Sequence, residues 1–259
     1  MKNHRNFDQR KEENDDKLSS IIYGRNPVLE LLKSQKRAVN KILISKTARG
    51  SAVSEIISIA KQRGISLHFV FGEKLDQISE NSQGIAAEVS AIEYIEIEDL
   101  IKKSKQNPKP LLVLLDGISD PHNLGAIIRN CAVFGADGAI IPKWRAAGVN
   151  ETVAKTSAGA VEYVPISRVS NLNNAIGLLK KSGFWIAGAQ NGEKKSQSIV
   201  NLSFPFPLAI IIGSEGGGLH RITKESCDYI VSIPQQSEIS SLNAACAAAI
   251  LLYEVSKLR

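Results

Sequence analysis

Apolar residues along this chain gather in short continuous runs of strand length, and between these runs they recur at helical spacing. The runs predict strands at 39–44, 67–70, 85–89, 111–115, 139–142, 161–166, 185–189, 208–212 and 231–234. The helical spacing predicts helices, the clearest at 27–32, 53–61, 124–134, 172–182 and 242–258. Continuous apolar strands that alternate with helices indicate an α/β fold with a parallel sheet covered on both faces.

Polar residues in front of the helices predict where several of them begin. Asn26 as the N-cap, with Pro27 at the first helical position, predicts the start of the first helix. Asn123 stands where the cap of the helix 124–134 belongs, and Ser240 or Ser241 is suited to cap the last helix. Capping is therefore one interpretation of these side chains, and a role in a site is the other.

Changes in composition divide the chain into four parts. Residues 1–19 form a polar tail, which has too few apolar side chains to offset the entropy lost on ordering, so we expect disorder there. Residues 20–95 predict a small α/β domain. Residues 96–110 contain lysines and prolines with little that packs, which predicts a basic linker. A second α/β domain follows at 111–259.

Charge and composition narrow the class of protein. The net charge is +6 and the pI is about 9.2, which favours a polyanionic partner such as nucleic acid, although a mildly basic surface explains it as well. The three cysteines have no metal-ligand spacing, so we expect reduced thiols and no metal. With no apolar run of membrane length and no secretory signal, we expect a cytoplasmic location and no membrane partner.

Three polar stretches are the best candidates for a site, because each follows a predicted strand and open α/β sheets bind ligands at strand ends. The stretch 116–130 contains Asn123 and Arg129, and an arginine in a mostly apolar helix is either exposed or aimed at an anion. The stretch 233–245 contains Ser241 and Asn243 ahead of an alanine-rich helix.

The middle stretch, 212–219, is rich in glycine and contains Glu215. It lacks both the P-loop pattern and the Rossmann pattern. A carboxylate in this loop would repel phosphates, so the loop is better suited to a cofactor without phosphates that is held by backbone groups. These residues by themselves predict an α/β enzyme with a ligand site at the strand ends.

Together, the three stretches resemble the three motifs of the SpoU/TrmH-type RNA ribose 2′-O-methyltransferases, in order and at similar separations. The matching segments read DPHNLGAIIR, IIGSEGGGL and IPQQSEISSLNAACA, and the segment 157–160 with Glu162 and Pro165 is also similar. The resemblance covers essentially all of residues 111–259.

The N-terminal segments 22–28 and 83–89 resemble the L30e-like substrate-binding domain of the subgroup that methylates a guanosine in bacterial 23S rRNA. This sequence departs from the pattern at Ser82, where relatives often have histidine. It also departs at Trp144 and 146–148, where a proline-containing loop is expected.

The resemblance implies a SPOUT-type parallel sheet with a deep trefoil knot, S-adenosylmethionine as the cofactor, 23S rRNA as the partner and a homodimer. It further implies a catalytic group that consists of Asn123, Arg129, Glu215, Ser241 and Asn243. Backbone groups at Gly213, Ile233 and Leu242 would hold the cofactor. A tRNA ribose methyltransferase and a non-catalytic RNA-binding protein on the same scaffold are the alternatives, whereas the missing phosphate fingerprint disfavours a nucleotide-dependent oxidoreductase.

Overall fold

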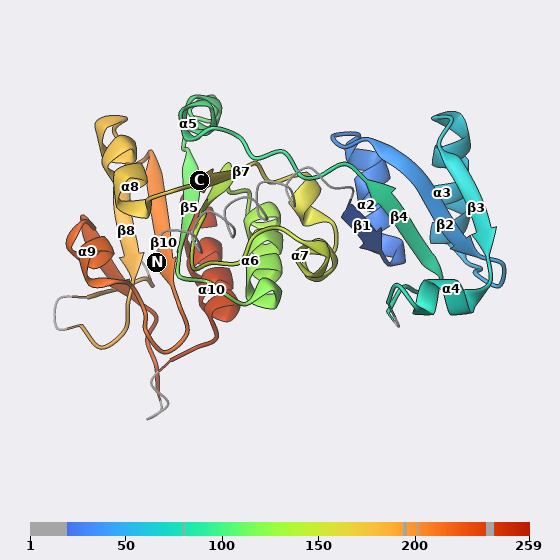
Figure 1. Cartoon of the computed structure of the whole chain (residues 1–259). Coiled ribbons are helices and arrows are strands. Elements are labelled where there is room, and N and C mark those ends of the chain that lie inside the picture. The colour runs from blue at the N-terminus through green and yellow to red at the C-terminus, as the bar shows by residue number, and fades with distance from the viewer. Residues whose placement is uncertain (1–19, 80, 194–195, 201, 237–240) are drawn as a thin grey trace, which may run out of the picture. The chain divides into compact units, whose positions relative to one another are not determined.

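The computed structural model describes residues 20–79, 81–193, 196–200, 202–236 and 241–259 (Figure 1). The predicted disordered tail 1–19 lies outside these residues. The described chain forms two compact units, of which the first consists of 20–93 and Val149–Glu162, and the second of Tyr94–Gly148 and Tyr163–Arg259. No helix in the described ranges is long and apolar enough to cross a membrane.

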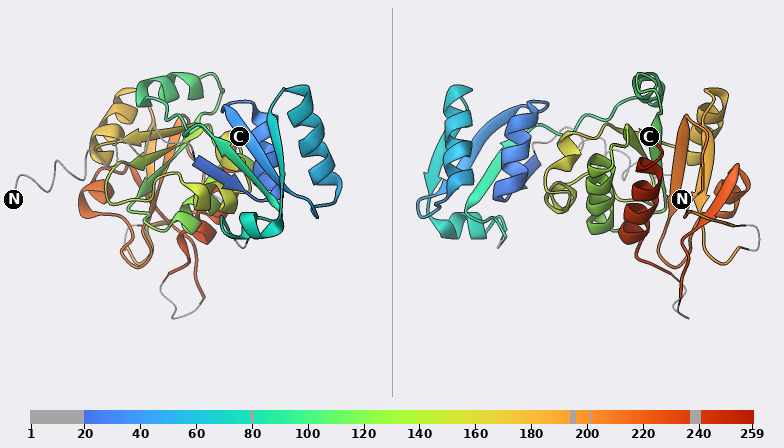
Figure 2. Two further views of the ribbon diagram at one scale, coloured as in Figure 1. Left: turned by 45° about the vertical axis from the view of Figure 1, so that its right-hand side comes forward. Right: turned by 180° about the vertical axis from the view of Figure 1, so that it is seen from behind.

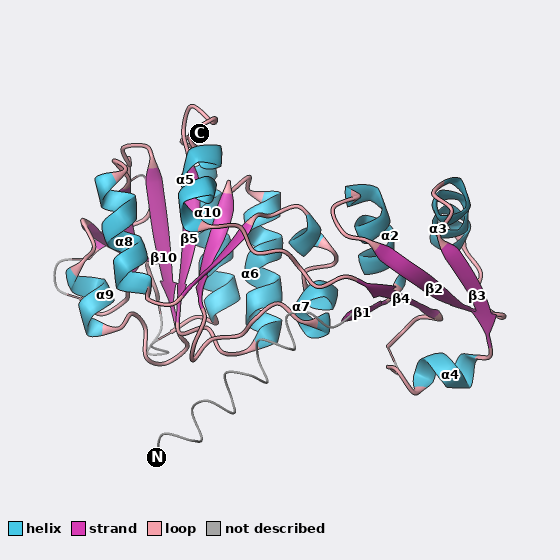
Figure 3. Ribbon diagram, turned by 45° about the horizontal axis from the view of Figure 1, so that its top comes forward, coloured by secondary structure: helices cyan, strands magenta, loops and turns pink. Residues whose placement is uncertain are grey.

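The first unit is built on a four-stranded sheet in the order β1-β4-β2-β3. Strand β4 runs antiparallel to both of its neighbours, and β2 runs parallel to β3. Helices α2 and α3 pack on each other and on this sheet (Figure 3). The elements of this unit are β1 (Ser20–Tyr23), α2 (Arg25–Ser34), β2 (Val39–Ser45), α3 (Ser51–Gln62), β3 (Ser66–Val70), α4 (Gly72–Asp76), β4 (Ile85–Val89), α7 (Glu151–Thr156) and the 3₁₀ helix η1 (Ala160–Glu162).

Helix α2 begins two residues earlier than the sequence predicts. Its N-cap is Gly24, whose φ of 99° lies in the region that favours glycine, so the expected cap at Asn26 is wrong. The Oε1 atom of Gln83 accepts a hydrogen bond from the backbone N–H of Arg25 at 3.1 Å. A side chain distant in the sequence therefore satisfies a free donor of the first turn, and local patterning does not reveal it.

The second unit contains a sheet of seven parallel strands, in the order β7-β6-β5-β10-β8-β11-β9, which confirms the predicted parallel α/β sheet. Strand β5 is buried along its whole length, as expected for a strand with helices on both faces. The trefoil knot that the resemblance implies stays a prediction. The strands are β5 (Leu111–Asp116), β6 (Gly138–Pro142), β7 (Ile166–Val169), β8 (Trp185–Ala189), β9 (Gln197–Ser198), β10 (Leu208–Gly213) and β11 (Tyr229–Ser232).

Helices cover both faces of this sheet (Figure 2). On one face α6 (Pro121–Val133) packs against α10 (Ala244–Ser256), and α10 also contacts β10. On the other face α5 (Ile97–Ser104) and α8 (Leu172–Lys181) share a core with alternate residues of the central strands, such as Leu112 and Leu114. The short helix α9 (Arg221–Glu225) contacts α8.

Helix α5 occupies residues 97–104 of the segment 96–110 that the sequence predicts as a linker. Its buried residues Leu100 and Ile101 belong to the core of the second unit. Lys102 and Lys103 fall in its last turn, where the helix dipole favours cations. Lys102 and Lys103 thus belong to the polar part of an amphipathic helix, whereas Lys105 and Lys109 follow it.

The predicted strand at 161–166 is wrong, because Val161 and Glu162 lie in η1, residues 163–165 connect the two elements, and only Ile166 belongs to β7. Gly159, with a φ of +86°, precedes η1, and a Cβ added there would lie 2.5 Å from Cβ of Glu30. Glu162 therefore belongs to the first unit, and only the last residue of the apolar run, Ile166, belongs to the parallel sheet of the second unit.

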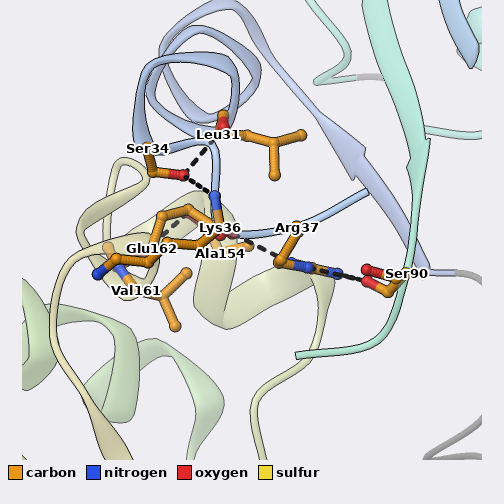
Figure 4. Close-up of polar contacts among 9 residues, drawn as sticks. Leu31, Ser34, Lys36, Arg37, Ser90, Ala154, Val161 and Glu162 are labelled. Carbon is orange, nitrogen blue, oxygen red and sulfur yellow. Dashed lines mark hydrogen bonds and ion pairs between the residues drawn. The ribbon is translucent and has the colours of Figure 1, made fainter. Parts of the chain in front are cut away.

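A buried ion pair holds this segment in the first unit (Figure 4). Nη1 of Arg37 lies 3.1 Å from Oε1 of Glu162, and the two side chains are only 6% and 1% exposed. Arg37 also donates from Nε to the backbone oxygen of Ser90 at 2.8 Å. Burial raises the pKa of Glu162, and the charge of Arg37 opposes this shift. The pair ties η1 to the residue that follows β4.

We expect Glu162→Ala to lower the free energy of unfolding by about 3–5 kcal/mol, because it leaves the buried Arg37 charge without its partner. The matched control is Glu55→Ala, which removes the exposed Lys33–Glu55 pair at 2.9 Å and should cost far less, because water already solvates both charges. Urea unfolding followed by circular dichroism measures both. Equal losses in the two variants would contradict the proposed stabilising role of the buried pair.

Candidate active site

A cavity of about 330 Å³ opens at the carboxyl ends of β8, β10 and β11 in the second unit. This volume falls in the range of small-molecule sites. Gly213, Ile233 and Leu242, which the resemblance assigns to the cofactor, all line it. Glu215 and Ser241 line it as well, so five of the residues singled out in the sequence meet at one cavity.

The glycine-rich loop forms a tight hairpin in the wall of this cavity. Ser214 and Gly218 exchange two backbone hydrogen bonds, at 3.1 and 3.0 Å. A Cβ at Gly213 would overlap the backbone of Gly218, so no other residue fits there without moving the loop. The close turn brings Gly213, Gly216 and Gly218 to the cavity wall, where no side chain covers their backbone groups.

The sequence analysis missed the loop that follows β8. Gln190, Asn191 and Gly192 line the cavity. Oε1 of Gln190 accepts a hydrogen bond from the N–H of Leu219 at 2.9 Å, and Oδ1 of Asn191 accepts one from the N–H of Ile233 at 3.2 Å. These side chains tie the three cavity loops together. The available signal was their position, directly after a predicted strand, which they share with the other candidate stretches.

Asn123, Glu215 and Asn243 form a polar cluster beside the cavity. Oε1 of Glu215 accepts hydrogen bonds from Nδ2 of Asn123 at 3.0 Å and from Nδ2 of Asn243. Nδ2 of Asn243 also lies 2.8 Å from Oδ1 of Asn123. The backbone N–H of Ala244 donates to the same Glu215 oxygen at 3.3 Å. One carboxylate oxygen thereby joins α6, the glycine-rich loop and the start of α10.

Helix capping explains how these side chains become available. Asp120 caps α6 by accepting from the N–H of His122 at 3.0 Å, so the expected cap at Asn123 is wrong and its side chain is free for the cluster. Asn243 caps α10, where its Oδ1 accepts from the N–H groups of Ala245 and Cys246 at 2.9 and 3.2 Å.

The capping role expected for Ser241 is therefore wrong, because Asn243 supplies the cap of α10. Ser241 lies at the cavity wall instead. Ser240 falls outside the described residues. Asn243 thus does two things at once, since its oxygen caps the helix and its nitrogen binds the cluster.

In a single chain, Arg129 is separated from the Asn123–Glu215–Asn243 cluster. It is an exposed residue of α6, six positions after Asn123. An α-helix turns and rises so that these two side chains point about 120° apart and sit roughly 9 Å apart along the axis. The guanidinium is therefore on the outer face of α6, open to a partner or substrate.

Cysteine chemistry does not account for the site. Burial raises the pKa of Cys131 and of Cys227 to about 12, so both thiols stay protonated at neutral pH. Within the described ranges no group of three His, Cys, Asp or Glu side chains is arranged to hold a metal ion.

The chain matches two family models. Residues 110–253 match the SpoU rRNA methylase family, and this match covers more than half of the chain. The chain belongs to the SpoU rRNA methylase family. Residues 21–95 match the RNA 2′-O ribose methyltransferase substrate-binding domain, so this family member is an RNA ribose 2′-O-methyltransferase with its own substrate-binding domain. The resemblance seen in the three motifs is confirmed.

Relatives agree with this assignment. A putative TrmH family tRNA/rRNA methyltransferase of Bacillus subtilis is 40% identical over 240 residues, which are 92% of this chain and 95% of the relative. The crystal structure of an AdoMet-bound rRNA methyltransferase from Sinorhizobium meliloti has a TM-score of 0.78 at 22% identity, over 95% of this chain and 90% of that one. A TrmH/SpoU tRNA modifying enzyme of A. aeolicus has a TM-score of 0.53 at 27% identity, over 63% of this chain and 82% of that one. These likenesses show the SpoU-type fold.

Proposed function

We propose that this protein transfers the methyl group of S-adenosylmethionine to the ribose 2′-OH of a guanosine in 23S rRNA. The observation that carries the proposal is the Asn123–Glu215–Asn243 cluster, which joins the first motif to a cavity lined by residues of the second and third motifs. The bound AdoMet named for the Sinorhizobium meliloti structure supports the choice of cofactor.

The cavity fits this cofactor in shape and chemistry. Ile212, Val231, Ile233 and Leu242 give it apolar walls, which suit an adenine ring. The hairpin at Gly213 offers backbone groups in place of a phosphate-binding pattern. S-adenosylmethionine carries no phosphate. When bound, it would supply an electrophilic methyl group to the ribose oxygen, with S-adenosylhomocysteine as the leaving thioether and the hydroxyl proton passing to water.

In the proposed reaction the residues of the chain orient the ribose and stabilise its oxygen. A ribose hydroxyl is a weak nucleophile, so positioning and charge stabilisation carry much of the catalysis. An arginine keeps its proton in proteins, so Arg129 serves as a cation beside the developing alkoxide and an adjacent phosphate rather than as a base.

The remaining residues of the site hold the reacting groups in place. Glu215 fixes Asn123 and Asn243 through its hydrogen bonds. Asn123 then positions the ribose, and Ser241 contributes at the cavity wall.

The choice of 23S rRNA rests on the fused N-terminal domain and its resemblance to that subgroup. The match to a substrate-binding domain over residues 21–95 supports an RNA partner, and the net charge of +6 favours phosphate contacts. The target base is expected in a loop, since sequence-specific RNA recognition mostly uses unstacked bases. A tRNA substrate is the second candidate, because the relatives are named for tRNA and rRNA together.

The deciding experiment incubates the protein with labelled S-adenosylmethionine and, in parallel, unmodified 23S rRNA and unmodified tRNA. We expect label in 23S rRNA alone, with 2′-O-methylguanosine identified by mass spectrometry of the nucleosides. Label in tRNA alone would keep the reaction and overturn the 23S target. Cofactor binding without label in either RNA would favour the non-catalytic alternative.

Arg129→Ala should lower kcat for methyl transfer by about 10²–10³-fold, because it removes the charge beside the developing alkoxide. Binding of S-adenosylmethionine, measured by calorimetry, should persist, since Arg129 is not among the cavity-lining residues. Arg129→Lys is the matched variant: it keeps the charge and therefore the KM for RNA, but loses the planar fork, so kcat stays low. Activity of Arg129→Ala within tenfold of wild type would contradict the catalytic role of Arg129.

We further propose that the protein is a homodimer through the outer face of α6 and α10. Large apolar side chains are exposed on these two packed helices, at Val133 of α6 and at Ile250 and Tyr253 of α10. Contiguous exposed apolar surface is typical of an interface. Arg129 lies one turn before Val133, so a dimer built this way places the proposed catalytic arginine at the interface.

Val133→Glu should convert the dimer to a monomer, because a charge would be buried at the interface. Light scattering coupled to size-exclusion chromatography measures the mass. Phe71→Glu is the matched control, since Phe71 and Val133 are both 69% exposed, and it should leave the mass unchanged. A wild-type mass of one chain would refute the dimer directly.

A further inference from the structure

A second cavity in the catalytic unit has no role in the chemistry described above. It measures about 610 Å³ and opens at the carboxyl ends of β5 and β6, beside the start of α8. Ser214 lines both cavities, so the two adjoin. Resting on the proposed function, we propose that this second cavity binds an unstacked nucleotide of the substrate RNA.

The first argument is the aromatic side chain of Trp144, which lies in the loop after β6 and lines the cavity. It is 41% exposed, and Nζ of Lys143 lies 5.2 Å from its ring centroid. An exposed indole with a cation beside it is a platform on which a nucleobase stacks. Trp144 is also a position at which this sequence departs from the loop expected for the family.

The second argument is charge. Arg145 and Arg221 line the cavity and are exposed, and Asp116 is the acidic residue that lines it. Both oxygens of Asp116 are already occupied, because Oδ1 lies 2.8 Å from Nδ1 of His220 and Oδ2 accepts from the N–H of His220 at 2.9 Å. Arg221 pairs with the exposed Glu225 at 2.7 Å. The opening therefore favours an anion, and Arg145 is the cation that we assign to a phosphate.

The third argument is an unsatisfied acceptor. Oδ1 of Asn173, another residue that lines the cavity, is buried and accepts no hydrogen bond from any described residue. Buried polar atoms nearly always have a partner. A ligand that brings an N–H donor would satisfy this oxygen once the Asn173 side chain turns it toward the cavity, and nucleobases carry such donors on their edges. His220 also lines the cavity with an exposed ring, of which Nδ1 lies against Asp116.

These three features fit one ligand. The base stacks on Trp144, a donor on its edge reaches Oδ1 of Asn173, and the phosphate meets Arg145. Because the cavity adjoins that of the cofactor at Ser214, a nucleotide held here would fix the RNA close to the reacting ribose. We therefore assign Trp144 and Asn173 to substrate positioning.

Tryptophan fluorescence tests the site without any need for turnover. The chain contains two tryptophans, so Trp185→Phe leaves Trp144 as the only reporter and Trp144→Phe leaves Trp185. Trp185 is a matched control: it is 43% exposed but lies at the amino end of β8, with Tyr229 at 5.9 Å between ring centroids. Adding a 23S rRNA transcript should quench Trp144 and leave Trp185 unchanged, while filter binding shows that the RNA is bound.

Two variants then test the role in catalysis. Trp144→Ala should raise the KM for RNA about tenfold through the loss of stacking, with S-adenosylmethionine affinity unchanged. Asn173→Ala should also weaken RNA binding, yet leave thermal stability equal or higher, because it removes an unsatisfied buried acceptor. A merely structural asparagine would show the opposite pattern, with lower stability and unchanged RNA binding.

The outcomes separate this site from the proposed function. Bound RNA without quenching of Trp144, or an unchanged KM in Trp144→Ala, would overturn the nucleotide site and leave the methyl transfer standing. Quenching of Trp144 by an RNA that is never methylated would keep the nucleotide site and overturn the proposed reaction. Failure of the wild-type protein to bind either RNA would overturn both.

Discussion

The parallel direction of the seven strands in the second unit is the constraint on which the site depends. Because β5, β8, β10 and β11 run the same way, the loops that leave them meet at one edge, although up to about half of the chain separates them in sequence. A single carboxylate oxygen of Glu215 then secures that meeting point, since it accepts hydrogen bonds from Asn123, from Asn243 and from the backbone at Ala244. The common strand direction brings the loops to one edge of the sheet, and the Glu215 oxygen then joins the start of α6 to the start of α10.

Two cavities at the same edge have different chemical characters. The cavity at Gly213 combines apolar side chains with polar ones and a backbone hairpin, which suit a cofactor without phosphates. The cavity at Trp144 has an aromatic platform and cations, which suit a nucleotide. Ser214 contributes to both. A methyl donor and its acceptor need adjoining but distinct sites, and the turn after β10 forms the boundary between these two.

Sequence patterning was most successful where local physics decides the structure. Apolar runs of strand length located β5 and β10 almost to the residue, and glycine spacing marked the hairpin after Gly213. Patterning failed where a residue distant in the sequence decides the local structure. Gln83 stabilises an earlier start of α2, and Arg37 pairs with Glu162 in a segment that the pattern predicted as a strand. The caps show the same limit. Asp120 and Asn243 cap α6 and α10, so Asn123 is left for the cluster, and nothing in the local pattern distinguishes a capping asparagine from one that binds a carboxylate.

The segment Val149–Glu162 has a consequence for how this protein can be recombined. It lies within the family match at 110–253, yet it packs in the unit that contains the substrate-binding domain. The chain therefore passes between the two units three times, at 93–94, 148–149 and 162–163. A chimera that exchanged residues 21–95 alone would separate Arg37 from Glu162 and place a foreign surface against Gly159. The substrate-binding domain therefore cannot be exchanged by itself. A chimera between relatives must replace residues 21–95 and Val149–Glu162 together.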